Sequence, residues 1–165
     1  MDPLALDRLA LTPKTAAHLV AEAPDDILDA AGADGWSARR ALAFLRDAES
    51  LVHRLRLERI LAEETPRLAA FDDARWASSR HTHRDRKEEL LADFALQRQA
   101  TLGLLRALQP EQYRRSGRLP TGEPLTVADL VDHLVAHDAV QVQRMERALG
   151  TTIAEVRQRR FHPPQ

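Results

Sequence analysis

A single stretch at residues 125–150 decides the fold: LTVADLVDHLVAHDAVQVQRMERALG. Thr126, with Asp129 three residues later, is a capping-box variant in which two side chains satisfy backbone N–H groups at a helix start. The apolar positions that follow recur at helical spacing, and Gly150 is a typical helix stop. The stretch therefore predicts one long helix from Thr126 to Leu149.

Apolar residues at helical spacing also occur in two segments earlier in the chain, with different residues at the helix ends. Ser37 can cap a helix that proline stops near Glu64, and a second apolar stripe runs from about Asp85 to Leu108. Before the first long helix we expect two short helices, ending near Leu11 and Ala23, and a helical turn at 24–31. Between the long helices we expect a connection at 66–84 with a short helix near 72–79, and a loop at 110–124 that is rich in Gly, Pro and Arg and can start with a helical turn. A last helix is expected to end near Arg160.

Together these elements predict an all-α protein built as a four-helix bundle, with short accessory helices at both ends. Three long helices and one contributed by the N-terminal region form the bundle. Because the connection at 66–84 is longer than a hairpin turn, we expect it to be a crossover. The whole chain, 1–165, is expected to form one domain with its core at about 11–149, followed by a C-terminal helix and a frayed tail at 150–165.

Composition excludes several classes of function. The chain has no cysteine, which removes disulfides, zinc–thiolate sites, iron–sulfur clusters and thiol nucleophiles. A net charge of −1 argues against specific nucleic-acid binding. Since the sequence contains neither a membrane-spanning apolar run nor the features of a signal peptide, we expect a cytoplasmic protein without a membrane partner.

Two sets of polar residues interrupt the apolar stripes. His137 and Gln141 lie one helical turn apart, so they could present a ring nitrogen and an amide oxygen to one point. The alternative is that both are core-edge residues held by hydrogen bonds. Arg98 lies among leucines and would need a carboxylate, either Asp47 or Glu49, unless it extends outward along its apolar stem.

Other histidines lie near these stripes or in a connection. His53 and His133 flank the stripes, and we keep His133 among the pocket candidates. His81 and His83 form an HxH motif, but neighbouring arginines favour a solvated segment over a metal site.

Several of these motifs resemble the DinB-like (YfiT-type) family of four-helix-bundle proteins. Gly35-Trp36-Ser37 followed by Leu42 to Glu49 is similar to the family's GWS…HL.D.E motif, and Phe94 to Arg98 is similar to its F-x-x-x-R helix. Leu125 to Leu130, running on to His137, resembles a third motif that usually ends in H-D-x-x-H. The resemblance covers about residues 11–149 and implies a bundle with a crossover that is often a homodimer.

The resemblance also implies a divalent metal held by three histidines, used by some members in reactions with bacillithiol or mycothiol. The three ligand positions fall here on Phe44, His137 and Gln141, so one histidine remains. One imidazole and a neutral amide make a poor zinc or nickel site. We therefore expect no cofactor and no transition metal at His137, which hydrogen bonds would hold instead.

Three functions remain open at this stage. The first is a metal-free DinB-like protein with a vestigial pocket or one that binds a small molecule, with Phe44, Asp47, Glu49, Arg98, His133, His137 and Gln141 as pocket candidates. The second is a transferase that uses zinc or nickel at His137, with Asp47 or Glu49 replacing a lost histidine. The third is a structural or partner-binding dimer associated with stress.

Overall fold

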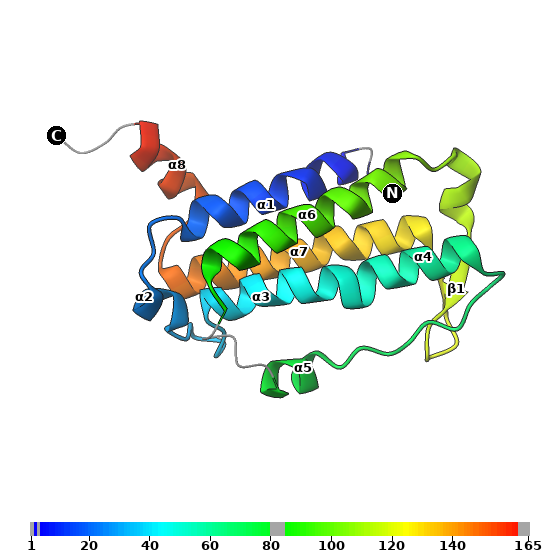
Figure 1. The fold of residues 1–165 in the computed structure, drawn as a ribbon, viewed down its shortest axis with the longest axis horizontal. Coiled ribbons are helices and arrows are strands. Elements are labelled where there is room, and N and C mark those ends of the chain that lie inside the picture. The colour runs from blue at the N-terminus through cyan, green and yellow to red at the C-terminus, as the bar shows by residue number, and fades with distance from the viewer. Residues whose placement is uncertain (1, 3, 80–84, 162–165) are drawn as a thin grey trace.

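The computed structural model describes residues 2, 4–79 and 85–161, and its main body is a four-helix bundle (Figure 1). The first and last bundle helices are α1 (Ala5–Val20) and α7 (Val127–Leu149), and α6 (Lys87–Arg106) is a third. The remaining helix consists of α3 (Ala38–Ala48), the π-helical segment η1 (Glu49–Arg54) and α4 (Leu55–Ala62). Because α1 and α3 each contact both α6 and α7, they occupy opposite corners of the bundle.

Short elements connect and flank the bundle helices. The connection between α4 and α6 returns along the bundle and carries α5 (Asp73–Ser79) past α3, which is the expected crossover (Figure 1). The others are α2 (Asp25–Asp29), the 3-10 helix η3 (Pro110–Arg114), the strands β1 (Ser116–Arg118) and β2 (Pro124–Thr126), and α8 (Ile153–Phe161).

The start of α7 confirms the cap expected from the sequence. The Thr126 hydroxyl accepts a hydrogen bond from the Asp129 backbone N–H at 3.0 Å, and the Asp129 carboxylate accepts one from the Thr126 N–H at 3.0 Å. Gly150 ends the helix in the left-handed conformation at φ 60°. The loop expected at 110–124 starts with the helical turn η3, as the sequence allowed, but the two-stranded antiparallel hairpin that follows was not expected. Three-residue strands are too short to show a period in the sequence.

The N-terminal region is one helix, where the sequence predicted two. Pro13 lies inside α1 and has no backbone N–H to donate to the carbonyl of Leu9, four residues earlier. That carbonyl instead accepts a hydrogen bond from Nη1 of Arg98 at 2.9 Å. Because a side chain from another helix satisfies the acceptor, the proline does not break α1.

A π-helical segment in the middle of the first long helix was also not expected. Within η1, Glu49, Val52 and His53 are buried, so an acid and an imidazole both face the interior. Single π-helical turns inside α-helices are frequent at functional sites.

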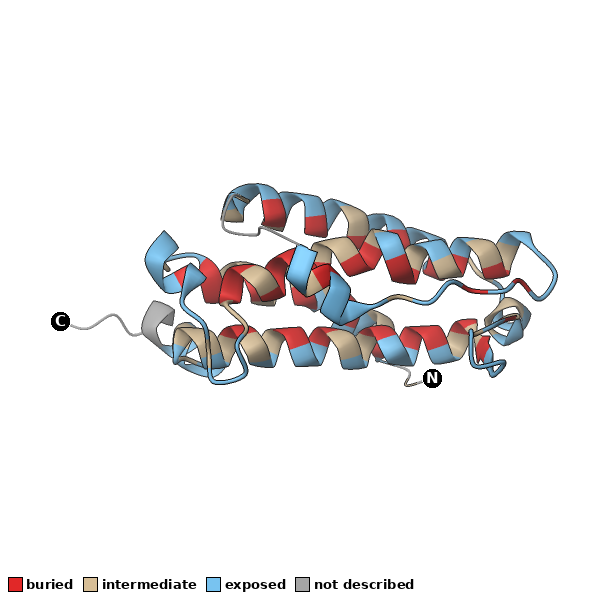
Figure 2. Ribbon diagram, turned by 90° about the horizontal axis from the view of Figure 1, so that it is seen from below, coloured by how far each residue is buried: buried red, intermediate tan, exposed pale blue. Residues whose placement is uncertain are grey.

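The buried residues lie on the inner faces of the helices, as the colouring in Figure 2 shows. Two clusters of hydrophobic residues fill the bundle, one around Phe44 and Phe94 and one around Ile60 and Leu130. The bundle also buries eight polar or charged residues among the described ones: Thr12, Arg39, Glu49, His53, Arg98, Thr101, Asp138 and Gln141.

None of the helices in the described part of the chain is long and apolar enough to cross a membrane.

Candidate functional site

The centre of the bundle holds an arginine with two carboxylates. Arg98 of α6 is 1% exposed, and its Nε and Nη2 donate hydrogen bonds to the two Glu49 oxygens at 3.1 and 2.9 Å. Its Nη1 and Nη2 also donate to the Asp138 oxygens at 2.6 and 2.9 Å. Thr12 of α1 donates its hydroxyl to Asp138 as well. The planar guanidinium therefore joins η1, α6 and α7 directly, and it reaches α1 through the Leu9 carbonyl.

This network keeps its charges despite burial. Burial disfavours the guanidinium charge, but the two carboxylates outweigh it and raise the pKa of Arg98 above its ordinary value. Burial by itself raises the pKa of Asp138, but the charge and hydrogen bonds of Arg98 lower it to about 2. Arg98 and Asp138 therefore form a charged pair at neutral pH, and the guanidinium also donates hydrogen bonds to both oxygens of Glu49 inside the bundle.

Of the two partners expected for Arg98, Glu49 is correct and Asp47 is wrong. The Asp47 carboxylate accepts hydrogen bonds from Nε of Arg46 at 2.7 Å and from Nε1 of Trp76 at 3.0 Å. Asp47 therefore lies toward the crossover segment, and its carboxylate is already used there. The second partner of Arg98, Asp138, was missed because it directly follows His137 and does not continue the apolar stripe of α7.

Two imidazoles lie beside the network. The rings of His53 and His137 have centroids 5.0 Å apart and are inclined at 58°. Nδ1 of His137 lies 3.9 Å from Oδ1 of Asp138, while its Nε2 has no hydrogen-bond partner among the described residues. The expectation that hydrogen bonds hold His137 is therefore wrong for Nε2. Burial, followed by the neighbouring His137, lowers the pKa of His53 to about 3, against the opposing effect of the Asp138 charge.

An aromatic cluster covers the other side of His137. The Phe44 ring meets the His137 ring edge-on at 5.1 Å between centroids, and Trp76 of α5 packs on Phe44 at 4.6 Å. Trp36 stacks on Trp76 at 6.1 Å. Phe44 is only 2% exposed, so this group belongs to the hydrophobic core.

Gln141 is buried on α7, but its amide oxygen does not face a site shared with His137. The oxygen accepts a hydrogen bond from Nη1 of Arg144 at 3.2 Å. The Arg144 guanidinium in turn lies 3.9 Å from the centroid of the Trp36 ring. Gln141 therefore takes part in an interaction at the edge of the aromatic cluster.

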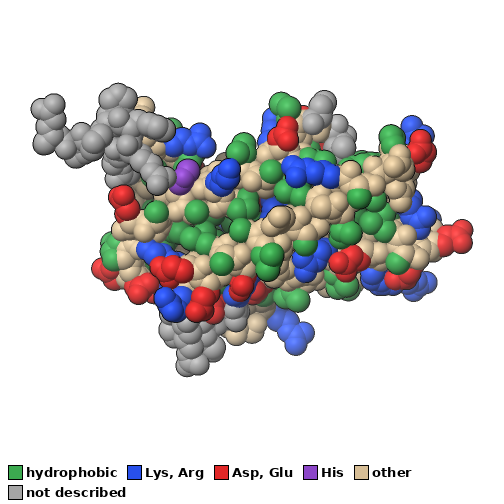
Figure 3. All heavy atoms as spheres, turned by 45° about the horizontal axis from the view of Figure 1, so that its top comes forward, with side chains coloured by type: hydrophobic (Ala, Val, Ile, Leu, Met, Phe, Trp, Pro, Cys, Tyr) green, Lys and Arg blue, Asp and Glu red, His purple; other side chains and the backbone are tan. Residues whose placement is uncertain are grey.

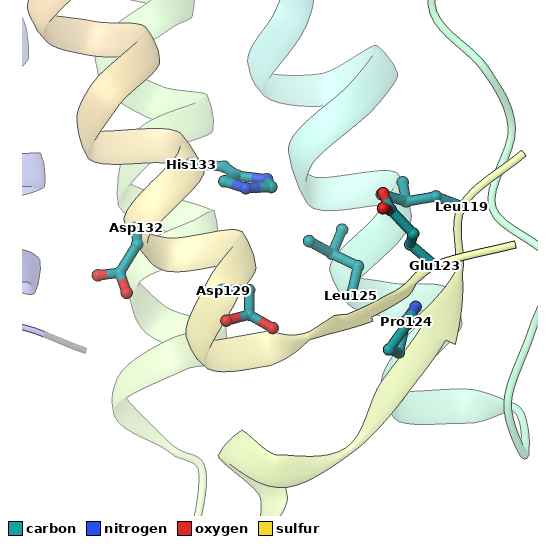
Figure 4. A pocket seen from close by; sticks show the side chains of 7 residues that line it. All are labelled: Leu119, Glu123, Pro124, Leu125, Asp129, Asp132 and His133. Atoms are coloured by element: carbon teal, nitrogen blue, oxygen red, sulfur yellow. The ribbon is translucent and has the colours of Figure 1, made fainter. Parts of the chain in front are cut away.

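The structure separates His133 from the other pocket candidates. His133 is exposed on the first half of α7 and lines a surface hollow of about 400 Å³ near the β-hairpin, with Asp129, Asp132 and Glu123 (Figure 4). His81 and His83, which form the HxH motif, lie outside the described residues.

A second cavity, of about 320 Å³ and open to solvent, lies between α1 and α7. Its walls are mainly apolar and include Leu9, Leu11 and Val135. Thr12 and Asp138 also line it, which connects the cavity to the buried network. Cavities of this size with few polar groups are typical of small-molecule sites.

The crossover bundle with a polar network between its helices defines the class to which this protein belongs. A family model described as the DinB superfamily matches residues 8–143, and the chain therefore belongs to this superfamily. A solved structure of YfiT from Bacillus subtilis, described as a probable metal-dependent hydrolase with an unusual four-helix bundle topology, is similar in fold. Its TM-score is 0.78 at 24% identity, over 90% of this chain and 87% of that one. No curated protein matches significantly.

The residues at the family's three ligand positions do not fit a divalent metal. Phe44 offers no donor and fills the space beside His137, and the Gln141 oxygen is bonded to Arg144. No group of three or more potential ligands that could hold a metal is present in the described part of the chain. Zinc and nickel favour several nitrogen or thiolate donors, so His137 alone is insufficient.

Proposed function

We propose that this protein works without the divalent ion of the three-histidine site and binds a small, largely apolar molecule between α1 and α7. The observation that carries this proposal is the edge-on contact between Phe44 and His137, which places a hydrophobic ring where a metal ligand would be needed. The function is then one of binding, and no cofactor is required for it.

The contacts of the nearby carboxylates favour this proposal over a metal-dependent thiol transferase. A replacement ligand would have to come from Asp47 or Glu49. Asp47 is held by Arg46 and Trp76, and both Glu49 oxygens are bonded to Arg98. A carboxylate already neutralised by a guanidinium is a weak ligand, so rescue from either side chain is disfavoured.

Restoring the lost ligands tests the metal-free part of the proposal. In a Phe44→His, Gln141→His variant we expect about one zinc or nickel ion per chain, because histidines would then occupy all three of the family's ligand positions. The untagged natural protein should contain neither ion in stoichiometric amount, as measured by elemental analysis. A Phe44→Leu, Gln141→Leu variant is the matched control. If the natural protein contained stoichiometric zinc or nickel and lost it on His137→Ala, the metal-dependent thiol transferase would be the better-supported function.

An apolar fluorescent probe tests the binding part of the proposal. We expect anilinonaphthalene sulfonate to bind with about 1:1 stoichiometry, because the cavity is apolar and Arg8 lies at its lining. Ala139 lines the cavity, so Ala139→Trp should fill it and reduce probe binding at least about tenfold, which corresponds to 1.4 kcal/mol. Ala136 is exposed one turn earlier on α7 and does not line the cavity, so Ala136→Trp is the control. Equal probe affinity in both variants would contradict the proposed site.

The assembly that we propose is a homodimer, as the resemblance implies. Leu57 and Leu61 do not support it, because Leu57 is 1% exposed in the core and Leu61 packs against the same cluster. Better support comes from Leu4, Leu11 and Leu96, which are 54–67% exposed, and Figure 3 shows hydrophobic side chains among charged ones along one face. Sedimentation at micromolar concentration should show twice the 18.6 kDa chain mass. A monomer alone would refute the dimer.

A further inference from the structure

The side of α7 that points away from the bundle is exposed along most of the helix. α7 packs mainly against α1 and α3, whereas five residues on its other side are exposed: Asp132, Ala136, Val140, Gln143 and Arg147. They recur every three or four positions and therefore lie along one side of the helix, which we call the outer face of α7. Val140 is 45% exposed, so an apolar side chain lies in the middle of this face.

The residues of α7 are arranged symmetrically about a point near the middle of the helix, between Ala139 and Val140. Asp132 and Arg147 lie equally far from this point in opposite directions, and they carry opposite charges. The same relation joins Ala136 to Gln143, and His133 to Glu146. Two copies of α7 packed antiparallel would therefore bring each residue opposite one that complements it, which is what an interface with two-fold symmetry requires.

We propose that the homodimer forms through the outer faces of two α7 helices, packed antiparallel about a two-fold axis that passes beside Val140. This inference rests on the homodimer proposed above and specifies the surface that the two copies share. Asp132 of each chain then faces Arg147 of the partner subunit, so the contact between opposite charges occurs twice. Parallel packing is disfavoured, because it would place equal charges beside each other at both ends. Ala136, with its small side chain, allows the two helix axes to approach to about 8–10 Å.

Exposed apolar residues beside the outer face enlarge this contact. A standard interface buries about 800 Å² on each partner, which is more than one helix face of about 22 Å between Asp132 and Arg147 supplies. Leu11 of α1 is 54% exposed and lines the same cavity as Ala139, so it lies next to the outer face and adds apolar area. None of the five residues of the outer face lines that cavity, so the proposed site for an apolar molecule stays within one chain.

Because the chain has no cysteine, single cysteines introduced into the full chain can report which residues meet across the interface. We expect Val140→Cys to form a disulfide-linked dimer on mild oxidation, since a residue beside the two-fold axis lies within the roughly 7 Å between Cα atoms that a disulfide allows. Arg147→Cys, about 22 Å along the helix from its own copy, should form none by itself but should link to Asp132→Cys when the two variants are mixed. Leu96→Cys, which is 67% exposed on α6, is the control. Gel electrophoresis without reductant measures the linked fraction.

Charge reversal followed by sedimentation is the second test. Asp132→Arg and Arg147→Asp should each raise the dissociation constant of the dimer at least about tenfold, because equal charges then meet twice. The double variant should return it close to that of the natural protein, and Glu88→Arg, exposed on α6, should leave it unchanged. A natural protein that stays monomeric would refute the homodimer itself. An unchanged dimer in both single variants, or a disulfide through Leu96→Cys and none through Val140→Cys, would leave the homodimer standing and refute this surface.

Discussion

Replacing Arg98 by methionine should lower the free energy of unfolding by about 3–5 kcal/mol, because it leaves buried carboxylates without their counter-charge. Glu49 and Asp138, 1% and 6% exposed in their side chains, would then face each other without a cation. For a chain of this length, the melting temperature should fall by roughly 10 °C. Thermal unfolding followed by circular dichroism at neutral pH measures the effect.

The control for this experiment must be an exposed arginine. Arg39 is unsuitable because it is 3% exposed and donates a hydrogen bond to Asp29. Arg106 lies on the same helix as Arg98 and is exposed, so Arg106→Met should cost less than about 1 kcal/mol. Replacing Glu49 and Asp138 by leucine together with Arg98→Met should recover much of the lost stability, since no buried charge then remains. Equal effects of Arg98→Met and Arg106→Met would contradict the role of the network.

In metal-free buffer, the stability of the natural protein should fall steeply as the pH is lowered from about 6.5 to 4.5. Burial and the neighbouring His137 lower the pKa of His53 to about 3 in the fold, while the unfolded chain takes up this proton near the ordinary pKa of 6.5. Between these values the unfolded state binds more protons, so stability decreases as the pH falls. The loss is about 1.4 kcal/mol per pH unit at most, or roughly 2–3 kcal/mol over this range.

Chemical denaturation across pH 4.5–7 tests this dependence. His53→Phe should remove most of the slope, because a phenylalanine has no proton to take up. The exposed His133→Phe should leave the slope unchanged. Protonation of Asp138 does not interfere with this test. Because the pKa of Asp138 is lowered in the fold, its protonation reduces stability only when the pH falls below the ordinary value of 3.8. The same slope in natural protein and His53→Phe would show that another group causes the acid sensitivity.

The fold could be predicted from the sequence because its evidence is local. The cap at Thr126 and the stripe of α7 depend on spacings of three or four residues, and the observed helix begins and ends where they predict. The α1 helix was misjudged at Pro13 because the group that compensates for the proline, Arg98, lies far away in the chain. The π-helical turn at Glu49 likewise has no local signature.

The candidate site was only partly predictable, for the same reason. Arg98 and Glu49 could be paired because a guanidinium among leucines requires an acid. Asp138 and His53 could not be assigned, since their roles depend on which faces of η1 and α7 meet Arg98. Asp47 was a plausible partner by position, but the crossover segment brings Trp76 within hydrogen-bond distance of it.

The contacts of Arg98 also bear on how the bundle opens. Its guanidinium bonds to η1 and α7 and to the Leu9 carbonyl that Pro13 leaves free on α1. If any one of these helices detached, a charged group or a carbonyl oxygen inside the bundle would lose its hydrogen-bond partner. Partly open states of the bundle are therefore high in free energy. The four helices should therefore behave as a single cooperative unit, whose slowest amides exchange with solvent only when the whole domain unfolds.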